Sequence, residues 1–111
     1  MKDCFVRGTT ETYIVECDSV TGFSAEDIVE VSLFMTHKGI KTDISDRCVV
    51  DTVNNWVKAS FTQEDTFVMR AGCQVRFQMD VKYALADGGF QVSRLTEDVY
   101  EVKDSDRTEV M

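Results

Sequence analysis

The sequence predicts an all-β protein, an antiparallel two-sheet β-sandwich of immunoglobulin-like shape. Polar and apolar residues alternate strictly from Gln74 to Tyr83, which is the period-two pattern of a half-buried strand. Shorter alternating runs are separated by turns of Gly, Asn, Asp and Ser, and the chain has no proline. No segment keeps a helical period long enough for a substantial helix. A small β-barrel is the alternative architecture.

Size and charge limit the organisation of the chain and its partners. With 111 residues there is room for one domain, which we place at 1–103, followed by a charged tail at 104–111 that we expect to fray. The formal charge of -8 repels phosphate backbones and anionic lipid surfaces. We therefore expect neither nucleic acid nor a membrane as a partner.

The first half of the chain reads as short strands joined by turns. The 28–36 run places Val29, Val31 and Leu33 on one face. The expected elements are two extended segments around Gly8-Thr9-Thr10, a helical turn at 24–27 capped by Ser24, a strand at 28–36, a turn at 37–39 and a strand at 40–44.

A second group of elements leads to the central strand. The expected elements are a turn at 45–47, an apolar run at 48–50, a reversal at 53–56 and a strand at 57–61. A capped helical turn should follow at 62–66, because Thr62 can accept from the amide three residues on while Asp65 reaches back.

The central strand continues into a hairpin. Phe77 and Met79 lie on its apolar side, and we expect both to be almost fully buried. Asp87-Gly88-Gly89 supplies the turn, and the last strand runs from Phe90 to 102. Apolar residues change face along this last strand, which predicts a β-bulge near Arg94.

The cysteines and the single histidine are expected to be structural. Cys4, Cys17, Cys48 and Cys73 should be reduced and mostly buried, and Cys4 and Cys17 are candidates to face each other on neighbouring strands. No C-x-x-C pair occurs, so we expect no metal and no other cofactor. His37 precedes a Lys-Gly turn and is expected to be solvated.

Four apolar residues fall on faces that are otherwise polar, and they are the candidate partner-binding residues: Ile14, Ile28, Phe34 and Trp56. Either they form an exposed patch for a partner, or loops and a change of register cover them. A third option is that Trp56 stacks against a sugar.

Three segments resemble a known family: Phe5–Thr10, Phe61–Thr66 and the hairpin at 74–92. Their order and spacing are similar to those of small proteins encoded among the tail genes of phages and prophages of Gram-positive gut bacteria. Those proteins are similar in turn to the N-terminal β-sandwich module of siphophage baseplate upper proteins. The resemblance implies a β-sandwich that works as a structural part of a phage tail or baseplate.

These observations lead to one functional expectation and one alternative. The chain has no local nucleophile–base pattern, so we expect a non-enzymatic assembly protein that contacts tail or baseplate proteins or copies of itself as a homo-oligomer. The alternative is a binding module, for example for carbohydrate at a host surface. No apolar segment resembles a signal peptide, so we expect the protein to stay in the compartment where it is made. The resemblance implies that this compartment is the bacterial cytoplasm and that the protein is incorporated into a virion.

Overall fold

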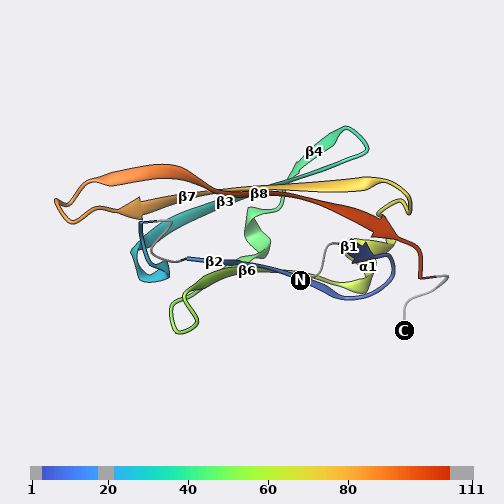
Figure 1. Ribbon diagram of the computed structural model, residues 1–111, viewed down its shortest axis with the longest axis horizontal. Coiled ribbons are helices and arrows are strands. Elements are labelled where there is room, and N and C mark those ends of the chain that lie inside the picture. Colours follow the sequence, from blue (N-terminus) through green and yellow to red (C-terminus); the bar gives the residue numbers. More distant parts are fainter. Residues whose placement is uncertain (1–3, 18–21, 106–111) are drawn as a thin grey trace.

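The computed structural model describes residues 4–17 and 22–105, and it confirms the predicted all-β sandwich. Two sheets lie face to face (Figure 1). The larger sheet has the order β1 (Cys4–Val6), β8 (Phe90–Lys103), β7 (Gln74–Ala84), β3 (Ile28–His37) and β4 (Ile40–Asp43). The smaller sheet has the order β2 (Glu11–Glu16), β6 (Trp56–Phe61) and β5 (Cys48–Asp51).

Short helical turns lie at the predicted places between the strands: η1 (Ala25–Asp27), η2 (Ser45–Arg47) and α1 (Gln63–Phe67). At η1 the Asp27 carboxylate accepts from the Ser24 N–H at 3.2 Å. At α1 the Thr62 hydroxyl accepts from the Asp65 N–H at 3.2 Å, and the Asp65 carboxylate accepts from the Thr62 N–H at 2.7 Å. The capping box at α1 therefore forms as the sequence predicts, and a capping box also forms at η1, where the sequence predicts only a helical turn capped by Ser24.

One strand pair departs from the predicted antiparallel arrangement. β1 pairs with β8 in parallel, Cys4 opposite Glu101 and Val6 opposite Lys103. β1 thus belongs to the larger sheet, while β2, which follows it, belongs to the smaller one. The prediction that Cys4 and Cys17 face each other on neighbouring strands is wrong for this reason.

The core lies between the two sheets and is centred on β7. Phe77 and Met79 are both fully buried, as predicted. The Phe77 ring has four aromatic neighbours at centroid distances of 4.8–5.8 Å, namely Phe5, Tyr13, Phe61 and Tyr100. Because these rings come from five strands of both sheets, one cluster joins the two layers.

The buried hydroxyl of Thr66 joins α1 to the segment between β1 and β2. Its Oγ1 accepts from the Gly8 N–H at 3.0 Å and donates to the Thr9 carbonyl at 2.7 Å. The Gln63 side-chain amide adds a bond to the Gly8 carbonyl at 3.1 Å. α1 thus holds the chain where it passes from one sheet to the other.

The long β7–β8 hairpin carries the predicted bulge. Asp80 lies opposite Arg94, Met79 lies opposite Thr96, and Leu95 is the extra residue between them. The tip of the hairpin extends past the smaller sheet (Figure 1), so the molecule is elongated, with extents of 53 × 29 × 23 Å.

The start of the predicted tail is attached to the domain. The Ser105 hydroxyl donates to the Arg7 carbonyl at 2.6 Å, and the Arg7 N–H donates to the Lys103 carbonyl at 2.8 Å. Ser105 is thus bonded to the domain, and the prediction for residues 106–111 lies outside the described residues. Within the described ranges, no helix is long and apolar enough to cross a membrane.

Candidate functional site

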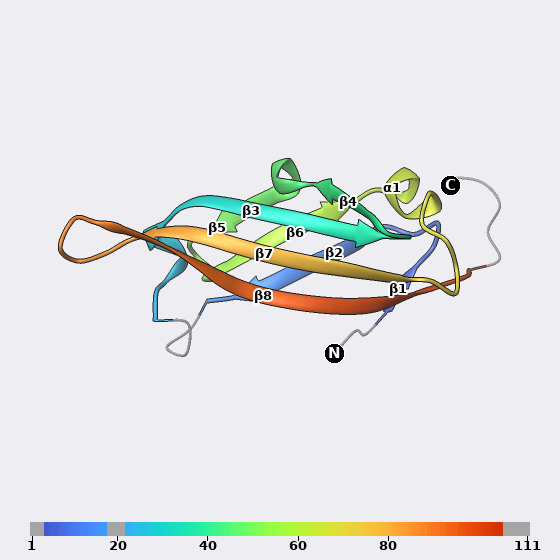
Figure 2. The ribbon, with the colours of Figure 1, turned by 90° about the horizontal axis from the view of Figure 1, so that it is seen from above.

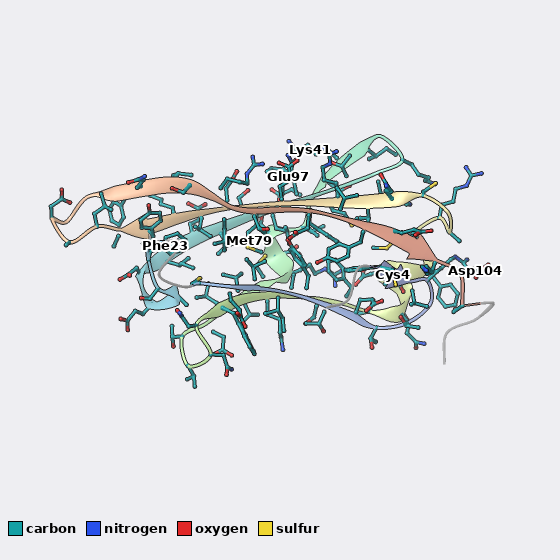
Figure 3. All side chains as sticks on the ribbon, in the orientation of Figure 1. Cys4, Phe23, Lys41, Met79, Glu97 and Asp104 are labelled. Atoms are coloured by element: carbon teal, nitrogen blue, oxygen red, sulfur yellow. The ribbon has the colours of Figure 1, made fainter. Side chains whose placement is uncertain are left out.

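The four predicted partner-binding residues lie at three different places. Ile14 and Trp56 share the outer face of the smaller sheet, and Phe34 lies on the outer face of the larger sheet. Ile28 packs against the core. Figure 3 shows the two sides of the larger sheet: Met79 points between the sheets, whereas Glu97 and Lys41 lie on the outer side. Phe34 and Trp56 therefore cannot form one continuous patch.

Ile28 was assigned to the wrong face because β3 contains a second bulge. The register with β7 shifts between Ile28 and Glu30, so Ile28 lies opposite Tyr83 and turns inward. The extra residue, Val29, is 58% exposed. The sequence does not reveal this bulge, because two adjacent apolar residues fit either register.

The outer face of the smaller sheet carries three apolar side chains around one lysine, and we call these four residues the small-sheet face: Ile14, Val49, Trp56 and Lys58. Ile14 and Val49 lie directly opposite Lys58 on either side, and they are 43% and 61% exposed. Trp56 lies two residues along β6 from Lys58 and is half-buried. Val49 was missed in the sequence because it sits in a short continuous apolar run.

Trp56 has an unusual polar environment on this face. Among the described residues, no hydrogen-bond partner contacts its buried indole Nε1. An unpaired buried donor costs about 1–3 kcal/mol. Trp56 lies opposite Glu16 in β2 and Asp51 in β5, so its ring sits between two acidic positions.

The outer face of the larger sheet is predominantly charged. The Lys41 ammonium lies 4.7 Å above the centre of the Phe34 ring, so part of this aromatic side chain is covered. Arg94 pairs with Asp80 and, at 3.2 Å, with Glu97. Exposed ion pairs of this kind contribute little to stability but give the face a fixed charge pattern.

His37 is not the solvated turn residue that the sequence predicts. It ends β3 half-buried, and the Arg70 N–H donates to its Nε2 at 2.9 Å. Its Nδ1 lies 3.0 Å from the Gln74 carbonyl oxygen. A backbone N–H can only donate, so Nε2 is the acceptor and Nδ1 carries the proton. The neutral ring thus ties the end of β3 to the start of β7.

Cys4, Cys48 and Cys73 are free thiols and only half-buried, whereas Cys17 is buried. Burial, with help from the nearby carboxylates of Asp46 and Asp43, raises the pKa of Cys48 to about 11. A thiol of this kind is a poor nucleophile at neutral pH. In the described ranges, no group of three or more His, Cys, Asp and Glu side chains is placed to hold a metal ion.

Two buried polar groups have structural partners. The Tyr13 hydroxyl donates to the Asp98 carboxylate, which also accepts from the Thr96 hydroxyl at 2.9 Å. Burial and this bond to Asp98 raise the pKa of Tyr13. The Glu11 carboxylate accepts from the Val6 N–H at 2.7 Å. These contacts link β2 to the strands of the larger sheet.

A hollow of about 230 Å³ opens beside β4 and α1. The Arg47 guanidinium and the Asp65 carboxylate, 2.6 Å apart, lie at this hollow. Its apolar lining comes from Met35, Ile44, Phe61, Val68 and Met69. Four separate segments supply these side chains, so no local sequence pattern could have predicted the hollow.

The described residues thus form two outer sheet surfaces: the small-sheet face, which is largely apolar, and the outer face of the larger sheet, which is largely charged. No family model, no curated protein and no solved structure matches the chain.

Proposed function

We propose that this protein is a non-enzymatic structural component of a phage tail or baseplate. In this proposal it acts through protein–protein contacts, and the small-sheet face docks a neighbouring tail protein. The sequence resemblance supplies the phage context. The observation that carries the docking role is the group of Ile14, Val49 and Trp56 on the outside of the smaller sheet.

The physical argument rests on what this face presents to solvent. Ile14 and Val49 flank the aliphatic stem of Lys58, so a partner could cover apolar atoms without burying the ammonium group. Trp56 adds a large aromatic surface at low entropic cost, which is typical of residues that dominate binding energy. The face therefore suits a protein partner with an apolar surface and an acidic group near Lys58.

The test uses particles produced by a bacterium that carries the gene. The variant Ile14→Lys, Val49→Lys should be lost from purified particles, because two added charges would be buried in the contact. The control is Val29→Lys, which places one added lysine at an exposed valine of the other sheet. Equal melting temperatures would show that all three proteins fold. Absence of the wild-type protein from particles, or normal incorporation of the double variant, would refute the proposal.

A second candidate function is carbohydrate binding at Trp56, favoured by its position between Glu16 and Asp51. The Trp56 ring can stack on a sugar, and the exposed Glu16 carboxylate can accept from the sugar hydroxyls. The Asp51 carboxylate already accepts from the Val53 and Asn54 N–H groups of its own turn. The chain has one tryptophan, so its fluorescence reports directly on this site. A saturable fluorescence change on titration of the isolated protein with host wall polysaccharide would support this candidate, and an unchanged spectrum would exclude it.

A further inference from the structure

The long outer edge of β8 is open. β8 has 14 residues, and β1 covers only the three from Glu101 to Lys103. Within the described residues, the remainder of β8 pairs with β7 alone. Figure 2 shows β8 along one long side of the larger sheet, with the short β1 at one end. An open edge is a template for another strand.

The backbone of β8 is oriented for such pairing on the C-terminal side of the bulge. The Val102 N–H donates to the Cys73 carbonyl at 2.9 Å. Backbone bonds of an antiparallel pair alternate along each strand. Counting back from Val102, the N–H and C=O groups of Glu97 and Val99 point to the open edge.

The same holds on the N-terminal side of the bulge. The Leu85 N–H donates to the Gly89 carbonyl at 2.8 Å, which closes the hairpin. Counting forward from Gly89, the N–H and C=O groups of Val92 and Arg94 also point to the open edge. Each half of β8 thus has backbone groups that a further strand could bond.

The bulge makes the edge complementary to itself. Before Leu95 the outward side chains are Val92 and Arg94, and after it they are Glu97 and Val99. If a second copy lies antiparallel with Arg94 opposite Glu97 of that copy, Val92 lies opposite Val99 of that copy. Outward side chains then meet outward side chains on both sides of the bulge, as a continuous sheet requires.

The chemistry of these opposed pairs is favourable. Each contact would be made twice about the two-fold axis, giving two Arg–Glu pairs and two valine pairs across the strands. Val92 and Val99 are 66% and 45% exposed, so both have apolar surface left to bury. Within one copy Arg94 lies 3.2 Å from Glu97 and also pairs with Asp80, so ion pairs across the two strands would extend an existing ion-pair network.

We propose that two copies of this chain associate through antiparallel pairing of β8 with β8, in the register that opposes Arg94 to Glu97 and Val92 to Val99. The partner is a second copy, and the two larger sheets join along the part of β8 from Val92 to Val99, which β1 leaves uncovered. The proposal deepens the assembly role proposed above, but it uses a different surface from the small-sheet face. A bulge can also protect an edge from pairing, so a monomer is the natural competing outcome.

Sedimentation of the purified protein over a range of concentrations is the first test. We expect a monomer–dimer equilibrium that the variant Val92→Lys, Val99→Lys shifts to monomer, because opposed lysines repel. Val29→Lys lies in β3, which β7 separates from β8, and this variant should dimerise like the wild type. A wild type that stays monomeric at its highest soluble concentration, or a double variant that dimerises equally well, would overturn the proposal.

Cysteine crosslinking then tests the register. In a background with the native cysteines replaced by alanine, Val92→Cys protein is mixed with Val99→Cys protein under mild oxidation. The mixture should form a disulfide-linked dimer, and neither protein alone should do so, because like positions lie far apart in this register. The register would be refuted if either variant crosslinked with itself, or if the mixture of the two variants formed no disulfide-linked dimer. Sedimentation does not depend on this background, so the proposal stays testable if the background unfolds.

The two proposals can fail separately. Loss of incorporation in the Ile14→Lys, Val49→Lys protein tests the assembly role without touching β8. If that protein is lost from particles while the wild type is monomeric in solution, the assembly role stands and the β8 dimer is refuted. If the β8 dimer forms in solution and the protein is absent from particles, the dimer stands and the assembly role is refuted.

Discussion

Phe77 illustrates how much of this fold depends on single side chains. Its ring is fully buried and contacts aromatic residues from both sheets. Phe77→Ala would remove these contacts and leave a cavity, so we expect it to cost about 3–5 kcal/mol of the free energy of unfolding. Urea unfolding measures this value, with the exposed Val53→Ala as control. A loss below about 1 kcal/mol would show that β7 is not the centre of the core.

Asp65 gives the fold a predictable response to acid. Partial burial opposes its ionisation, but bonds from Thr62 and the Arg47 guanidinium outweigh it and hold the pKa of Asp65 below its usual range. A lowered pKa means that the ionised carboxylate stabilises the folded state. Its contribution is complete above the unfolded pKa of about 4 and is lost as the pH falls through the folded value.

The matching prediction compares the wild type with Asp65→Asn. At neutral pH the variant should be less stable, and the gap should narrow as the solution is acidified below pH of about 4, where the wild type also loses its charge. Thermal unfolding at a series of pH values measures the gap. A gap that stays constant down to the most acidic conditions would show that the carboxylate charge at Asp65 is not involved.

At the scale of elements, single side-chain hydrogen bonds hold neighbouring segments together. Thr66 bonds Gly8 and Thr9 from α1, and its side chain is fully buried. Thr66→Val keeps the shape but removes the partner of the buried Gly8 N–H and of the partly buried Thr9 C=O, so we expect it to cost about 1–3 kcal/mol. Thr66→Ser keeps the hydroxyl and should lose less. Chemical denaturation of both variants tests this, and equal losses would argue against the hydrogen bonds as the cause.

The elements also show how far sequence reasoning reaches. The bulge at Leu95 was predictable because alternation fails visibly there, with apolar residues on different faces before and after it. The bulge at Val29 was not, since its apolar neighbour Ile28 masks the shift. The capping box at α1 was predictable because it needs only four consecutive residues.

Local sequence patterns could not predict which of the two sheets each strand belongs to. Alternation shows that Cys4–Val6 and Glu11–Glu16 are strands, but not that they belong to different sheets. His37 was misjudged for the same reason, because its partners Arg70 and Gln74 are more than thirty residues away in sequence. The candidate surfaces shared this limit: Phe34 and Trp56 both face outward, but on opposite sides of the sandwich.

For the whole molecule, the formal charge of -8 opposes any association of two copies. Added salt screens this repulsion over distances of about 8–10 Å at physiological ionic strength. The cross-strand Arg94–Glu97 pairs would weaken as well, but they are fewer than the repelling charges. We therefore expect association to strengthen as salt rises, measured by light scattering. Association that weakens with salt would mean that attraction between opposite charges dominates the contact.

The parallel pairing of β1 with β8 has a mechanical consequence. The Cys4 end of β1 and the Lys103 end of β8 lie at opposite ends of their short paired segment. A force that pulls the two ends of the domain apart would slide β1 along β8, so the backbone bonds of this pair must break together rather than one by one. We expect single-molecule stretching to require more force through the chain ends than through handles at the facing ends of the hairpin, Ala84 and Phe90. A particle component with this connectivity would bear tension along its length and yield when peeled from the side.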